Sequence, residues 1–154
     1  MTANDLREAW RRLAQVRRVS FSANSNSAKK TGWSGSGEGT VAVMSDSPES
    51  MIFAERGTFK TESGKELSFE NSFRWSFDDN GRALQLEHLR FGPQRPVFLF
   101  KLVFAGPNLL VSDSPHACDQ DCYRARMEIA ESGIRLEWRV QGPEKDETIS
   151  YLYE

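Results

Sequence analysis

The feature that most constrains this chain is a two-residue alternation of apolar and polar side chains. Between Leu67 and Phe77 the large apolar side chains fall on odd positions and serine, glutamate or arginine on most even ones. Residues 134–140 repeat the pattern against arginine and glutamate. Because successive side chains of a strand point to opposite faces, each run predicts a strand with one buried and one wet face.

Turn signals separate these runs along most of the sequence. The segments SDSPES, ESGK, DDNG, GPQRP, AGPN and ESG are rich in residues typical of tight turns. The candidate strands between them cover residues 19–23, 33–43, 51–60, 66–77, 83–91, 97–104, 109–113, 123–129, 134–140 and 148–153.

The first residues have a different period. Apolar side chains recur there every three or four residues, and Thr2 or Asn4 can cap a helix over about residues 4–17. The apolar set is Leu6, Ala9, Trp10, Leu13 and Val16.

An antiparallel meander over about residues 18–154 must close or stack to hide its edge strands. We therefore predict one all-β domain, residues 1–154, with an up-and-down barrel of about eight to ten strands and one N-terminal α-helix. An open sandwich is the alternative, since a strand count does not distinguish closure from stacking.

Glycine is concentrated on one face of the second candidate strand. Trp33, Gly35, Gly37, Gly39 and Val41 share that face. Glycine in a strand interior indicates strong curvature or the close approach of another chain segment. The strand is therefore expected at a bend in the barrel wall.

The amino-acid composition limits the classes of partner that this protein is expected to bind. The 154 residues carry 20 basic and 22 acidic side chains, a net charge of -2. Because the charges are interspersed, neither nucleic acid nor a membrane is an expected partner. We find no signal peptide or membrane span and expect a cytoplasmic protein, whose two cysteines would usually be thiols.

One polar cluster stands out. His116, Cys118, Asp121 and Cys122 fall within seven residues. They allow a zinc site, a disulfide, or a Cys118 nucleophile paired with His116. The interpretation we favour is a polar loop whose aspartate and histidine side chains satisfy backbone groups, and within which Asp121 or Asp113 orients His116. No metal and no cofactor are expected.

Polar residues also interrupt apolar stripes of the strands. Glu55, Asn71, His88 and Lys101 each occupy a position that would face the interior of a small barrel. A buried polar group requires a partner or a ligand. The alternative is that bulges shift the stripe and place some of these groups in solvent.

Several motifs are similar to those of an uncharacterised family, a domain of unknown function with a lipocalin-like (calycin) barrel. The matching residues are Trp33, Glu55, Gly57, His116, Cys118, Asp121, Tyr123, Trp138, Val140, Gly142, Pro143, Lys145, Asp146 and Tyr151. The resemblance implies a barrel with a site near its C-terminal motifs, and it implies no activity.

Three hypotheses about function follow. The leading one is a small-molecule-binding barrel whose site comprises Glu55, His88, His116, Cys118, Tyr123, Trp138, Lys145 and Asp146. The second is an enzyme that performs acid-base chemistry with His116, Asp121, Tyr123 and Lys145, as some calycin-like barrels do. The third is a protein-interaction module or homodimer that uses an exposed strand edge.

Overall fold

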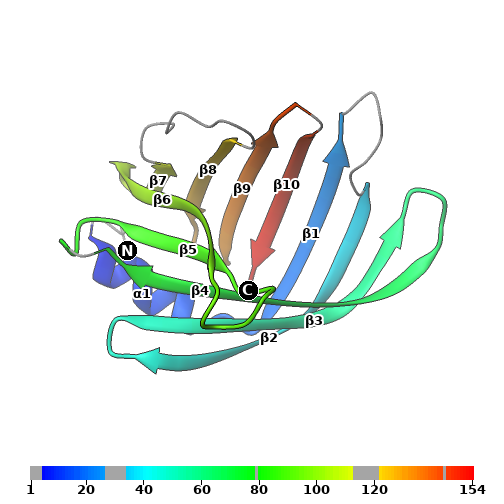
Figure 1. Ribbon diagram of the computed structural model, residues 1–154. Helices are drawn as coiled ribbons and strands as arrows, with labels where there is room; N and C mark the ends of the chain where they lie inside the picture. Colours follow the sequence, from blue (N-terminus) through cyan, green and yellow to red (C-terminus); the bar gives the residue numbers. More distant parts are fainter. Residues whose placement is uncertain (1–4, 27–33, 79, 113–121, 144) are drawn as a thin grey trace.

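The computed structural model describes residues 5–26, 34–78, 80–112, 122–143 and 145–154 (Figure 1). These ranges hold one helix and ten strands. They are α1 (Leu6–Ala14), β1 (Arg18–Ser25), β2 (Gly35–Ser47), β3 (Ser50–Thr61), β4 (Glu66–Phe77), β5 (Leu84–His88), β6 (Val97–Gly106), β7 (Leu109–Ser112), β8 (Cys122–Ile129), β9 (Ile134–Gln141) and β10 (Asp146–Tyr153).

The strands form a closed antiparallel barrel. Each strand pairs with its neighbours in sequence, and β1 pairs with β10 as well as with β2. The register of the closing pair sets Val19 opposite Tyr153 and Phe21 opposite Tyr151. The predicted up-and-down barrel is therefore confirmed, and the open sandwich is wrong.

The fifth strand is shorter than predicted. The pairing of β5 with β6 shifts register between Leu86 and Glu87, and β5 ends at His88. The backbone then turns, so that the Leu89 amide donates to the carbonyl of Ser72 and the Leu89 side chain is buried. The extra residue of this bulge, Leu99, lies on β6, so the bulge does not account for the change of parity in β5 after His88.

The helix is shorter than predicted: it begins at Leu6, the first residue of its apolar period, and ends at Ala14. Asp5 is the N-cap, and its Oδ1 accepts a hydrogen bond of 2.8 Å from the Glu8 amide. This bond satisfies one of the donors left free in the first helical turn. The expected caps, Thr2 and Asn4, lie outside the described residues.

The helix packs across one end of the barrel. Ala9 and Leu13 have no exposed surface and belong to the same apolar core as the strands. Trp10 stacks on Phe77 at 4.6 Å between ring centroids, and Arg12 donates to the carbonyl of Ala130. Figure 1 shows α1 at the opposite end of the barrel from the β9–β10 hairpin. We call this the helix end and the other the loop end.

In the described ranges, no helix has both the length and the apolar character needed to cross a membrane.

Glycines bring the backbones of β2 and β3 into close contact. Gly39 lies opposite Gly57, and a Cβ atom on Gly39 would be 2.0 Å from the carbonyl oxygen of Arg56. On the neighbouring pair, the Phe21 ring covers Gly37, where a Cβ atom would be 2.5 Å from the ring. Side-chain atoms are excluded at both sites, as the glycine-rich face predicts.

A first prediction concerns this contact. Replacing Gly39 with alanine should lower the free energy of unfolding by about 1 to 3 kcal/mol. The new methyl group would overlap backbone atoms of Arg56 and Gly57, which cannot move aside by a change of side-chain rotamer. Urea denaturation measures the change. Gly106→Ala is the matched control, since nothing lies within 4 Å of a Cβ there. Equal stability of the two variants would contradict the packing argument.

Candidate functional site

The inner face of the barrel carries a row of stacked aromatic rings. Tyr153 and Tyr151 of β10 stack at 5.5 Å with their planes 3° apart. Tyr151 in turn stacks on Trp138 of β9 at 6.2 Å and 6°. Tyr123 and Phe100 approach the Trp138 ring at 5.9 and 6.1 Å. Three nearly parallel rings thus present a continuous aromatic surface inside the barrel.

Glu55 lies at one end of this aromatic row. Its side chain is 2% exposed and comes from β3, between Phe53 and Gly57. The Tyr153 hydroxyl donates a hydrogen bond of 2.7 Å to Glu55 Oε2. Because β1 and β2 separate β10 from β3 in the wall, this bond crosses the interior and joins two strands that are not paired.

The second oxygen of this carboxyl group lacks a partner. Glu55 Oε1 is buried and accepts no hydrogen bond from the described residues, and the buried indole nitrogen of Trp75 is likewise unpaired. The buried indole nitrogen Nε1 of Trp138 also lacks a hydrogen-bond partner among the described residues. Such atoms are uncommon in a protein interior and call for an explanation.

Burial changes the protonation of this group. Loss of solvent raises the pKa of Glu55 to about 7, and the hydrogen bond from Tyr153 opposes the rise. Burial and the charge of Glu55 also raise the pKa of Tyr151 and of Tyr153, so both hydroxyls keep their protons near neutral pH. Tyr153 is therefore the donor, and Glu55 changes charge near pH 7.

Exposure varies along the inner wall. Near the helix end Phe53, Leu102 and Ile134 are fully buried, and Val43, Phe77 and Phe104 are partly buried against the core. Toward the loop end several apolar or aromatic inner side chains are only half-buried: Phe21, Leu67, Phe69, Tyr123 and Ile149. Solvent therefore reaches aromatic inner surface from the loop end.

Three of the four interrupting polar residues lie as the stripe predicts. Glu55 and Asn71 are cross-strand partners on the inner face. His88 is half-buried and stacks on Phe73 at 4.8 Å, and burial and Arg90 lower its pKa. Lys101 was weighed as an inner residue as well, but the favoured alternative was a lysine that reaches solvent from a strand with two apolar faces, and Lys101 does not face the interior. It alternates with the buried Leu102 and pairs with Gln85 on the outer face.

The structure describes only some of the site residues that were predicted near the C-terminal motifs. Tyr123 is half-buried on the inner face, and Lys145 is exposed in the β9–β10 hairpin at the loop end. Asp146 binds Arg139 at 3.1 Å on the outer face, so it does not face the interior. The places of His116, Cys118 and Asp121 in the predicted site are not tested, because these residues lie outside the described part of the chain.

Cys122 corrects an expectation about redox state. It was expected as a thiol and is disulfide-bonded. In the described part of the chain, no group of three or more histidine, cysteine, aspartate or glutamate side chains is placed to hold a metal ion.

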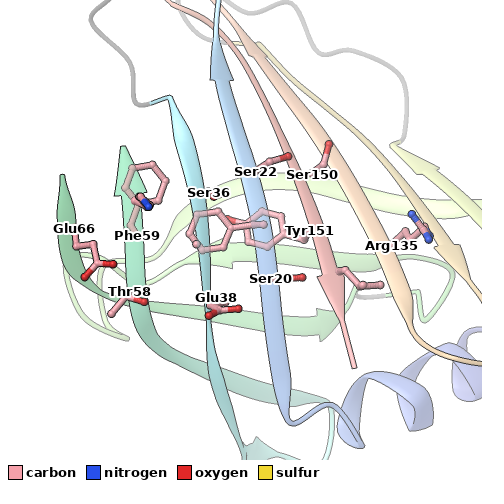
Figure 2. A pocket seen from close by; sticks show the side chains of 14 residues that line it. Ser20, Ser22, Ser36, Glu38, Thr58, Phe59, Glu66, Arg135, Ser150 and Tyr151 are labelled. Carbon is pink, nitrogen blue, oxygen red and sulfur yellow. The ribbon is translucent and has the colours of Figure 1, made fainter. Parts of the chain in front are cut away.

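A hollow of about 610 Å³ lies mainly on the outer face of β10, β1, β2 and β3. Figure 2 shows the hydroxyl groups of Ser20, Ser22, Ser36 and Ser150 along it, with Arg135 at one side. Polar side chains of the outer parity form much of its lining, and Phe21, Phe59 and Tyr151 of the inner wall line it as well. Through Tyr151 the hollow adjoins the aromatic row.

Nothing in the sequence pattern indicated that Tyr153 contacts Glu55. Ninety-eight positions separate the two residues. The alternation of Tyr151 and Tyr153 places both on one face of a strand, but only closure of the barrel brings that face opposite Glu55. Trp75 was recognised as a buried residue, and nothing in its pattern signalled an unpaired indole.

A second prediction follows from the raised pKa. An acid with a pKa near 4.5 unfolded and about 7 folded stabilises the fold below pH 4.5 and loses that contribution as pH rises to 7. The loss is about 3 kcal/mol. Between pH 4.5 and 8 the free energy of unfolding of the wild-type protein, measured by urea denaturation, should fall by this amount relative to that of Glu55→Gln.

The control for this experiment is Glu70→Gln. Glu70 lies exposed on the outer face, where it pairs with Arg56. Its substitution should shift stability by a similar amount at every pH. A stability difference for Glu55→Gln that does not vary with pH would contradict the assigned protonation change.

Comparison with known proteins gives one result on the family and none on the activity. No curated protein matches the sequence. A model of a family of unknown function, DUF6314, matches residues 14–154. The match covers all ten strands and the end of α1. The chain therefore belongs to the family of unknown function DUF6314.

Proposed function

We propose that the protein binds a small apolar or aromatic molecule inside the barrel, which it admits from the loop end. The observation that carries the proposal is the half-exposed aromatic inner surface there, formed by Phe21, Phe69 and Tyr123, whereas α1 packs across the helix end. Partly exposed aromatic surface in a concave wall gains free energy when an apolar molecule covers it.

Barrel size supports this proposal. Barrel diameter grows with the number of strands, and an eight-stranded wall already encloses enough room for side chains and, in some proteins, one small ligand. Ten strands give a wider interior.

Polar inner side chains would orient the molecule. Asn71 and His88 are half-buried on or beside the inner face, and Glu55 lies deeper. A few polar groups in a mainly apolar site are the usual means by which proteins fix the orientation of a ligand. Tyr123 and Lys145 lie at the loop end, where the molecule would enter. His116 and Cys118 remain part of the proposed rim.

A third prediction tests binding directly. N-phenyl-1-naphthylamine, a neutral dye that fluoresces in apolar surroundings, should bind the protein with a saturable rise in emission. Ala125→Phe should weaken binding at least about tenfold, because Ala125 lies on the inner face opposite Trp138 and the added ring occupies ligand space. Fluorescence titration gives both dissociation constants.

The matched control is Arg124→Phe, which adds the same ring to the adjacent, exposed position on the outer face. Its affinity for the dye should equal that of the wild-type protein. Thermal melting of both variants shows that they are folded. Equal affinity of all three proteins, or no saturable binding by the wild type, would exclude an interior site.

A further inference from the structure

Charge is divided between the two faces of the barrel wall. In the described strands no lysine or arginine occupies an inner position, because the cations share the parity of the exposed residues. The arginines of β3, β8 and β9 on that outer parity are Arg56, Arg124, Arg126, Arg135 and Arg139. An anion inside the barrel would therefore have no cationic partner among the described inner residues.

The inner face instead carries acids. Glu55 lies near the helix end with Oε1 unpaired. Glu147 is half-buried near the loop end, where it pairs with Ser25 and Val140 and shares the parity of Ile149 and Tyr151. The two carboxyl groups thus lie toward opposite ends of the aromatic row, and both disfavour a second negative charge.

The aromatic row also disfavours a negatively charged ligand. The ring faces of Trp138, Tyr151 and Tyr153 carry negative electrostatic potential, which attracts cations and disfavours anions. His88 does not reverse this preference, since burial and Arg90 lower its pKa and keep the imidazole neutral near pH 7.

From this arrangement we infer a ligand class, an inference that rests on the proposed function. The interior accepts aromatic molecules that carry an amino group, and it rejects aromatic carboxylates, sulfonates and phosphates. The preference arises from the acids Glu55 and Glu147, the negative ring faces, and the outward placement of the described cations.

The preference depends on pH through Glu55. The side chains facing it are Tyr153 and Tyr151 from β10, Asn71 from β4 and Val41 from β2. All four are uncharged near neutral pH. Asparagine and valine do not ionise, and the pKa of each tyrosine is raised. Since the pKa of Glu55 is about 7, its negative charge develops between pH 6 and 8, and selection for amines should increase over that range.

Two naphthalene compounds of similar size and opposite charge test the inference. 1-Naphthylmethylamine is a cation and 1-naphthoate an anion at pH 8. Tryptophan fluorescence of the full chain, titrated directly with each compound, should show the amine binding at least about tenfold more tightly. The advantage should be smaller at pH 6.

The variants Glu55→Gln and Glu147→Gln identify the cause. Each should reduce the preference for the amine, and the Glu55→Gln protein should lose the pH dependence. Glu147 lies near the loop end and is only half-buried, so its variant serves even if Glu55→Gln does not fold. Glu137→Gln, on the exposed outer face, should leave the preference unchanged.

The outcomes separate the two proposals. Equal or tighter binding of 1-naphthoate would overturn the ligand class and leave interior binding intact. Binding of N-phenyl-1-naphthylamine without binding of the amine would also overturn it. If none of the three compounds binds, the proposed function fails together with the ligand class. A preference that survives both inner substitutions would falsify the assigned role of the acids.

Discussion

Pairing of β1 with β10 is the interaction on which the rest of the structure depends. Without it, the sheet would have two free edges and its inner face would be open to water. Closure buries one parity of side chains on all ten strands. It also carries Tyr153, on the last strand, across the interior to Glu55 on the third. The polar contact in the core is thus a product of closure.

Glu55 is the main electrostatic feature of that interior. A carboxyl group that is 2% exposed loses nearly all its hydration, and one hydrogen bond from Tyr153 restores only part of it. The protein retains this group next to three stacked aromatic rings although an apolar residue would fit an apolar core better. We therefore associate it with the chemistry of the interior and not with stability.

Local pattern predicted the strands well because alternation and turn residues act over a few positions. The runs at residues 66–77 and 134–140 became β4 and β9 almost without change. The end of β5 was harder to predict, because the register shift between Leu86 and Glu87 depends on the partner strand β6. The face of Lys101 was ambiguous because β6 is apolar on both faces near that residue. Only the pairing of β6 with β5 shows which face is the outer one.

The candidate site was harder to predict for a different reason. Sequence proximity drew attention to His116, Cys118 and Cys122, which are neighbours in the chain. The described site joins Glu55, Trp138 and Tyr153, which are neighbours only in the closed barrel. Each was recognisable as an inner residue by period, and Glu55 and Trp138 were named as candidates. Their mutual contacts are a tertiary property.

The closing seam has a consequence for how the chain folds. Nine of the ten strand pairings join consecutive strands, so each needs only a short loop to close. The tenth joins Val19 to Tyr153 and carries the largest entropy of loop closure. We expect this seam to form last. Until it forms, β1 and β10 expose unpaired backbone, and the open sheet is the species most prone to associate with its own copies.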